Sequence, residues 1–200
     1  MKRILLLAIS VFAFAFGASQ TNTTIGYSYV RLDKASYQAI EVGTSVVAIA
    51  KKGFVRPYGG AEVSVPIFFD TSGSNQPEYS AKGTGYGVAL QVPLIFGIDI
   101  GGFYIQAMAG YNISWLNDAL KKIPSGAQIG AIKDAKTSTI SHGYIYGAGI
   151  GFNFSSNFTI GVRYIRGSMN NKVDNNLDEG VIPKYKTNYE KFMALIGYKF

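Results

Sequence analysis

The sequence predicts an all-β protein: an eight-stranded antiparallel transmembrane β-barrel preceded by a cleavable signal peptide. Three observations support this fold class. Apolar residues recur at every second position through most of the chain, turn residues interrupt this alternation at short intervals, and the alternating apolar side chains are too bulky for a barrel interior. The composition agrees, because 24 Gly and 14 Tyr among 200 residues favour strands and turns over helices.

Residues 1–19 have the three regions of a secretory signal peptide. Lys2 and Arg3 precede an apolar run over residues 4–18 that is too short to cross a bilayer as a helix, and small residues follow at its end. We place the cleavage site before Gln20 or within two residues of it. The alternative interpretation is a buried helix of a cytosolic protein. The remainder, residues 20–200, has the length of one domain and contains no cysteine for disulfides or a lipid anchor.

Eight segments carry the period of two that is typical of β-strands. In the last of them, Phe192, Ala194, Ile196, Tyr198 and Phe200 share one face, while the opposite face includes glycine and lysine. Turn residues bound each segment. The predicted strands cover residues 22–32, 38–51, 56–69, 82–96, 101–116, 138–154, 158–168 and 187–200.

Side-chain volume decides which face of these strands is inside. The apolar faces together carry bulky side chains, many of them aromatic, and the interior of an eight-stranded barrel has room for few large groups. The opposite faces carry mainly glycine, small polar residues and a few charges, which fit inside. The apolar faces are therefore predicted to form an outer band against lipid, and closure of the barrel pairs every backbone group.

The lengths of the connections predict the orientation in the outer membrane. Short connections such as "KKGF", "FGIDIG" and "SSN" alternate with longer ones such as "DTSGSNQPEYSA". Short turns of such barrels face the periplasm and long loops face outward, so both termini are expected to be periplasmic. Aromatic residues at the ends of the apolar faces then form two girdles: Phe103, Phe154, Phe158 and Phe200 below, and Tyr29, Trp115, Tyr144 and Tyr164 above.

Four charged residues fall on the inner faces: Glu41, Glu62, Arg163 and Lys191. An unpaired charge in a narrow interior is costly, so opposite charges on nearby strands are expected to pair. We predict that at least one of the two cations lies within ion-pair reach of Glu41 or Glu62 and blocks a continuous pore. The alternative is that these long side chains reach water at the rims.

The whole mature chain resembles the small eight-stranded outer-membrane β-barrels of the OmpA/OmpX type. The ending "FMALIGYKF" is similar to the C-terminal signal of that family, a final aromatic preceded by alternating apolar residues. The resemblance implies that Phe192, Ile196, Tyr198 and Phe200 are read by the barrel-assembly machinery during insertion. It also implies contact with outer-membrane lipids and lipopolysaccharide.

The expected role is structural, or a surface interaction such as adhesion or host contact, in which the outer loops bind an extracellular ligand. The alternatives are a narrow porin-like channel and an outer-membrane lipid-modifying enzyme. No catalytic, cofactor-binding or metal-binding residues are predicted. The formal charge of +7 falls to +5 without Lys2 and Arg3, and no basic run suggests nucleic-acid binding.

Three local motifs do not change this expectation. Ser141 and His142 are adjacent on a predicted strand and so point to opposite faces, unlike a hydrolase dyad. The glycines of "GAGIGF", residues 147–152, lie within a strand, and no helix follows to hold a phosphate. The segment "DNNLDE", residues 174–179, lacks the spacing of an EF-hand and is expected to be a solvated loop.

Overall fold

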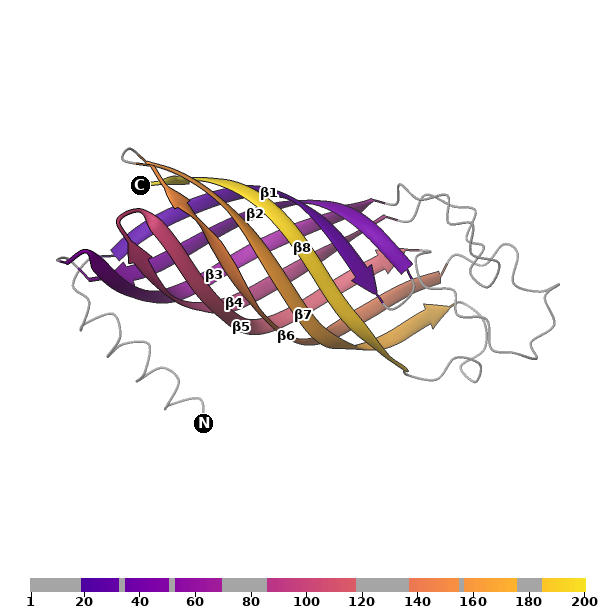
Figure 1. Ribbon diagram of the computed structural model, residues 1–200. Helices are drawn as coiled ribbons and strands as arrows, with labels where there is room; N and C mark the ends of the chain where they lie inside the picture. Colours follow the sequence, from indigo (N-terminus) through magenta and orange to yellow (C-terminus); the bar gives the residue numbers. More distant parts are fainter. Residues whose placement is uncertain are drawn as a thin grey trace.

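The computed structural model describes residues 19–32, 35–50, 53–69, 86–117, 137–154, 157–175 and 185–200. The predicted signal peptide thus lies outside the described residues, except for Ser19. The described chain forms eight strands that close into one antiparallel barrel (Figure 1). They are β1 (Ser19–Leu32), β2 (Ala35–Ile49), β3 (Val55–Phe69), β4 (Tyr86–Ile100), β5 (Phe103–Asn117), β6 (Thr137–Asn153), β7 (Phe158–Asn175) and β8 (Tyr185–Lys199). No helix in this part of the chain is long and apolar enough to cross a membrane.

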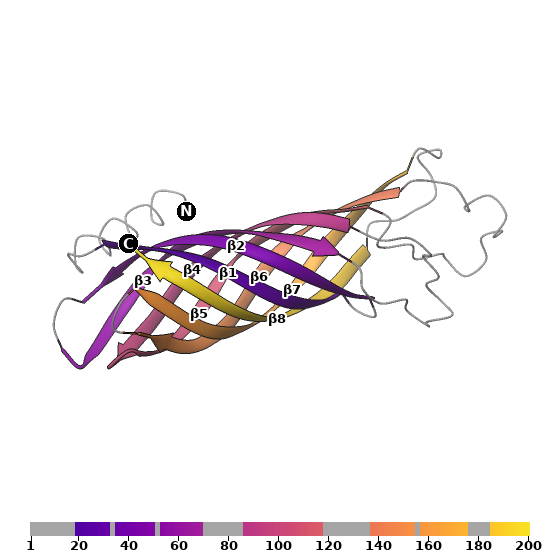
Figure 2. The same cartoon turned by 90° about the horizontal axis from the view of Figure 1, so that it is seen from above.

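Each strand pairs with its neighbours in sequence, and β8 pairs with β1 to close the barrel. The closing register joins Ile25 to Ile196, and the amide of Phe200 donates to the carbonyl of Thr21 over 2.9 Å. Figure 2 shows the strands inclined to the long axis of the barrel. Because the first and last strands pair, the sheet has no open edge, which is the condition for placing strands in lipid.

The two ends of the barrel differ in their connections. At the end that holds both Ser19 and Lys199, the strands are joined by short segments; we call this the turn end. At the other end, which we call the loop end, the brief connection 33–34 is accompanied by the longer segments 70–85, 118–136 and 176–184. Apart from the brief connection 33–34, long connections therefore alternate with short ones, as the sequence predicts.

Exposure alternates along every strand as the period of two predicts. The bulky apolar faces point outward, and even large side chains there are exposed, from Val63 near the middle of β3 to Ile105 near the start of β5 and Phe200 at the chain's end. The eight aromatic residues expected in the girdles are exposed: Tyr29, Phe103, Trp115, Tyr144, Phe154, Phe158, Tyr164 and Phe200. A water-soluble protein does not expose a continuous apolar surface of this extent, so the wall of the barrel is built to face lipid.

Several strand boundaries differ from the prediction by a few residues, and the ends of β4 and β7 are informative. The segment "FGIDIG" is not a turn, because β4 continues to Ile100 and the chain reverses at Gly101 and Gly102, whose φ angles are 58° and 99°. Two successive residues with positive φ suit the tight turn of a hairpin. Gly97 and Asp99 are residue types common in turns, but here they lie on the inner face of β4. A Cβ at Gly97 would lie 2.6 Å from the Tyr58 ring, and Asp99 accepts a hydrogen bond from Arg56.

Strand β7 also extends beyond the predicted end at residue 168, to Asn175. Asn170 and Asn171 resemble a turn in the sequence. In the structure Asn171 is buried and its side-chain amide donates to the hydroxyl of Thr187 on β8 over 3.0 Å. The asparagine therefore pairs strands inside the barrel instead of ending one.

The lumen is more apolar than the sequence suggested. A loop-side cluster fills the half toward the loop end: Val30, Leu32, Tyr37, Ala39, Phe68, Ala89, Met108, Leu116, Ile145, Ile165, Met169 and Tyr189. A smaller turn-side cluster consists of Tyr58, Ile95 and Tyr104, with Val47 and Ile49 packed against it. Polar and charged residues lie between the two clusters.

Candidate functional site in the barrel lumen

The middle of the lumen holds an ion pair between β3 and β7. Two guanidinium nitrogens of Arg163 donate to the two carboxylate oxygens of Glu62, over 2.6 and 2.8 Å. These strands are four apart in the eight-stranded barrel, so the pair crosses the interior. Both side chains are buried, with exposed fractions of 5% for Arg163 and 1% for Glu62. The bidentate geometry gives each charge two partners in place of water.

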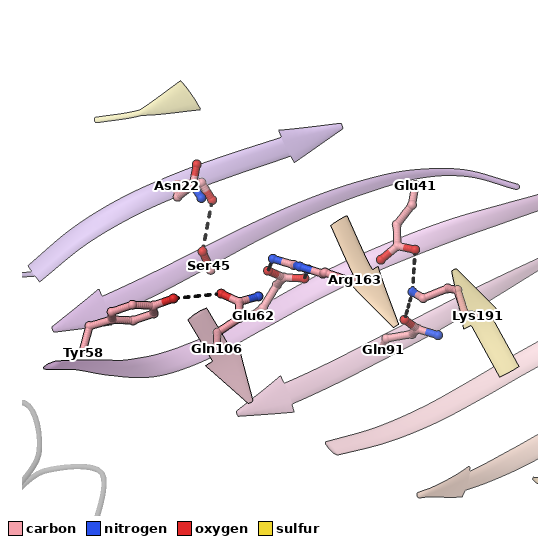
Figure 3. Close-up of polar contacts among 9 residues, drawn as sticks. All are labelled: Asn22, Glu41, Ser45, Tyr58, Glu62, Gln91, Gln106, Arg163 and Lys191. Atoms are coloured by element: carbon pink, nitrogen blue, oxygen red, sulfur yellow. Dashed lines mark hydrogen bonds and ion pairs between the residues drawn. The ribbon is translucent and has the colours of Figure 1, made fainter. Parts of the chain in front are cut away.

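A second ion pair lies closer to the loop end. The ammonium of Lys191 on β8 donates to Glu41 on β2 over 2.7 Å and to the amide oxygen of Gln91 on β4 over 2.5 Å (Figure 3). The amide nitrogen of Gln91 in turn donates to Asn112 over 2.9 Å and to the hydroxyl of Tyr189 over 2.8 Å. Lys191 is thus held from two strands on different sides of the lumen.

These contacts bring all four predicted lumen charges together as two pairs, Glu62 with Arg163 and Glu41 with Lys191. We call the four residues with Gln91 the ion-pair layer. A buried charge is costly unless it is paired and hydrogen-bonded, and every charge in this layer has a partner of opposite sign. Because the first pair links β3 to β7 and the Lys191–Gln91 contact links β8 to β4, these side chains span the barrel at this level.

Below the ion-pair layer, a cavity of about 50 Å³ extends to the turn end; we call it the turn-side chamber. Its polar lining includes Asn22, Gln106, Asn153, Arg163 and Lys199. Such a volume holds a few water molecules or one small ion. Among the described residues, the loop-side half of the lumen is thus packed with buried apolar side chains, whereas the turn-side half contains a cavity.

Glycines on the inner face leave room for the large side chains of this half. A Cβ at Gly161 would lie 2.1 Å from the Tyr104 hydroxyl, and one at Gly151 would lie 2.5 Å from it. Tyr58 donates a hydrogen bond of 3.1 Å to the amide oxygen of Gln106 (Figure 3). The period of two predicts that these glycines face inward, but only the structure shows the tyrosines that they accommodate.

The polar groups at the turn end form a compact network around Asp99. Its carboxylate accepts hydrogen bonds from Arg56 over 2.8 Å, from Asn153 over 2.7 Å and from the amide of Gly102 over 3.3 Å. The Asp99 side chain is buried, whereas Arg56 is partly exposed. The turn predicted at Asp99 is wrong. The signal for its inward position is the alternation on one face of Gln91, Pro93, Ile95, Gly97 and Asp99.

The outer surface keeps Ser141 and His142 apart. Ser141 is buried and its hydroxyl hydrogen-bonds to Asn171 inside the barrel. His142 faces outward, where its Nδ1 lies 2.5 Å from the hydroxyl of Tyr111. The two residues do not form a catalytic dyad, and the described residues contain no group of three His, Cys, Asp or Glu that could hold a metal ion.

The predicted assembly signal lies on the outer face of β8. Phe192, Ile196, Tyr198 and Phe200 are all exposed there. The ring of Tyr198 packs edge to face against Phe158 and Phe200, with centroids 5.3 and 5.0 Å apart. Recognition of these residues by the assembly machinery stays a prediction. The segment "DNNLDE" lies outside the described residues from residue 176 onward.

Comparison with known proteins tests the fold independently. No family model and no curated protein sequence matches the chain. Among solved structures, the chain is similar to Ail, the attachment invasion locus protein of Yersinia pestis, with a TM-score of 0.50 and 16% identity over 91% of this chain and 97% of that one. The chain has the fold of the small outer-membrane β-barrels. The resemblance to the OmpA/OmpX type is thereby confirmed at the level of the fold.

Two further solved structures are similar to this barrel. Ail in complex with the heparin analogue sucrose octasulfate aligns with a TM-score of 0.51 and 15% identity, over 91% of this chain and 97% of that one. The N-terminal β-barrel domain of Pseudomonas aeruginosa OprF aligns with a TM-score of 0.48 and 13% identity, over 92% of this chain and 100% of that one. At identities this low, the similarity concerns the fold and does not extend to the role of the lumen or the loops.

Proposed function

We propose that this protein is an integral outer-membrane barrel that acts through surface interaction by its long connections, with adhesion or host contact as the role. The observation that carries the proposal is the filled lumen. The ion-pair layer and the loop-side cluster together occupy the interior, so the barrel is a rigid support for the segments at its loop end. Binding residues in many proteins lie on loops that a rigid scaffold positions.

We place the loop end at the cell surface and both termini in the periplasm. The alternation of short and long connections supports this orientation, because outer-membrane barrels have short periplasmic turns and longer extracellular loops. Residues 70–85, 118–136 and 176–184 are then extracellular. Outer-membrane lipids and lipopolysaccharide surround the apolar wall, and the barrel-assembly machinery inserts it.

An acidic polysaccharide is the ligand class that we propose for the loops. Segment 118–136 carries four lysines, Lys121, Lys122, Lys133 and Lys136, against two aspartates. Clustered positive charge attracts sulfated or carboxylated chains through long-range steering. Ail, which shares the fold, has been solved with a heparin analogue, and this suggests heparin as the first probe.

The test compares two variants with equal loss of lysines from opposite ends of the barrel. In the first, Lys121 and Lys122 become Gln; in the second, Lys51 and Lys52, in the short connection between β2 and β3, become Gln. Intact cells that display equal amounts of folded barrel are incubated with fluorescent heparin and with cultured host cells. We expect the first variant to bind less and the second to bind like the wild type. Equal binding by all three proteins, or loss in the second variant alone, would contradict the proposal or its orientation.

A narrow channel is the second candidate, and the turn-side chamber favours it because half of the lumen is already hollow. A channel would require the side chains of the ion-pair layer to separate, whereas binding at the surface requires no change in the lumen. Single-channel recording in planar bilayers separates the two candidates. We expect no discrete conductance steps from the wild type; regular steps, together with unchanged heparin binding in the loop variant, would favour the channel.

A further inference from the structure

The turn-side chamber contains buried polar atoms without a hydrogen-bond partner among the described residues. The amide nitrogen of Gln106, the Nε of Arg163 and the amide oxygen of Asn22 are of this kind, and all three residues line the chamber. Gln106 is only 6% exposed and Arg163 only 5%. Buried polar groups normally have partners, so atoms that lack one beside a cavity indicate what the cavity binds.

The residues that carry the two donors lie on either side of a glycine. Gln106, Gly149 and Arg163 lie in one register row across β5, β6 and β7. A Cβ at Gly149 would lie 3.2 Å from the Gln106 amide nitrogen and 3.0 Å from the Arg163 Cγ. A side chain at residue 149 would therefore press on both the Gln106 amide nitrogen and the Arg163 side chain, and glycine avoids these contacts. Tyr58 fixes the orientation of Gln106 by donating to its amide oxygen, which directs the amide nitrogen away from that contact.

The charges around the chamber favour an anion over a cation. The carboxylate of Asp99 already accepts three hydrogen bonds, and that of Glu62 is held by both terminal nitrogens of Arg163. Lys199 adds a cation to the lining at the turn end and belongs to neither of these ion pairs. The charge that remains after pairing is thus positive, and the donors of Gln106 and Arg163 suit an acceptor without hydrogens.

We propose that the turn-side chamber binds one small inorganic anion, such as chloride, between Gln106 and Arg163. The anion accepts hydrogen bonds from the Gln106 amide and the Arg163 Nε, and a water molecule links it to Asn22. The ion enters from the turn end past Lys199 and stops at the ion-pair layer. The cavity of about 50 Å³ accommodates a halide ion and a water molecule. This site is independent of the role proposed for the loops.

A bromide soak of crystals of the whole protein tests the site directly. Bromide replaces chloride chemically and scatters anomalously. We expect an anomalous peak within hydrogen-bond distance of both Gln106 and Arg163. Density that fits water alone in the chamber, with no anomalous peak at high bromide concentration, would overturn the proposal.

A titration in solution provides a second test with matched variants. The backbone amide resonance of residue 149 is followed in bicelles while sodium chloride replaces sodium gluconate at constant ionic strength. We expect a saturable shift for the wild type. Gln106→Glu keeps the size of the side chain and an acceptor for Tyr58 but replaces the donor with a carboxylate, so the apparent Kd should rise by at least about tenfold. Lys186→Gln, which removes an exposed cation at the loop end, should leave the Kd unchanged.

The remaining outcomes also decide the proposal. A shift that rises linearly without saturation in the wild type, or an equal Kd in Gln106→Glu, would refute an anion site at Gln106. Should Gln106→Glu fail to fold, Gly149→Ala serves instead, because its methyl group would press on the Gln106 amide nitrogen and the Arg163 Cγ, and on the carbonyl oxygen of Val162, at 3.0–3.2 Å. Unchanged chloride affinity in Gly149→Ala would contradict the proposed position.

Discussion

Toward the loop end, the lumen is lined by apolar side chains such as Ile165 and Met169, packed as in a soluble core. Toward the turn end, polar side chains such as Gln106 and Asn22 surround a chamber, and only a small apolar cluster accompanies them. The same strands form both halves, and the same period of two directs their side chains. The difference shows that the same eight strands can pack apolar side chains at one end of the lumen and place polar side chains around a cavity at the other.

The ion-pair layer separates the two halves, and breaking it should have the largest effect on stability. Arg163→Ala leaves Glu62 buried without its partner, so we expect a loss of about 3–5 kcal/mol in the free energy of unfolding. Urea unfolding in lipid vesicles, followed by the fluorescence of the single Trp115, measures it. The double variant Glu62→Gln with Arg163→Met should recover part of the loss. A single variant as stable as the wild type would show that the pair is dispensable.

Two isoleucines provide a matched comparison of the two halves. Ile165 belongs to the loop-side cluster, Ile95 lines the chamber, and each is 2% exposed. Ile165→Ala creates a cavity in packed surroundings, and we expect a loss of roughly 2–5 kcal/mol. Ile95→Ala enlarges a space that polar groups already border, so its loss should be smaller. The same urea unfolding experiment compares them; a larger loss for Ile95→Ala would contradict the difference between the halves.

A charge on the outer wall should be costly whatever the lumen behind it contains, because the wall is surrounded by lipid. Arg introduced at Ile105, Val63 or Ile150 should lower the free energy of unfolding by roughly 2–4 kcal/mol when the site is near the bilayer midplane. Vesicle unfolding again measures the change. Tolerance of arginine at all three positions would argue against a lipid-facing wall.

The smallest effect on the folded barrel is expected at its last residue. Phe200 is 75% exposed, and its ring contacts Tyr198, so Phe200→Ala should change the free energy of unfolding by only about 1 kcal/mol. Assembly should suffer more, with less heat-modifiable protein in the outer membrane at high expression. Lys199→Gln, at the neighbouring inner position, serves as the control. Unchanged membrane levels of Phe200→Ala would refute the assembly-signal prediction.

Most of the fold could be predicted from the alternation of apolar side chains with small or polar ones along the sequence. Because the period of two is a local property of strands, the sequence was sufficient to separate Ile105 from Gln106 and to place Glu41, Glu62, Arg163 and Lys191 inside. It also predicted eight strands and the order of short and long connections. The prediction failed at residues of types that are common in turns but that lie within strands here. Gly97, Asp99 and Asn171 are of this kind, and they contact side chains from other strands.

The sequence by itself determined which face of each strand meets lipid, because volume and polarity alternate along the chain. Only the tertiary structure decided which inner residues meet one another. The partners Glu62 and Arg163, or Gln91 and Lys191, lie about a hundred residues apart and on opposite strands, so their contact depends on the register and closure of the whole barrel. The chamber depends on the same closure, since Gln106, Gly149 and Arg163 form one row only when three strands align.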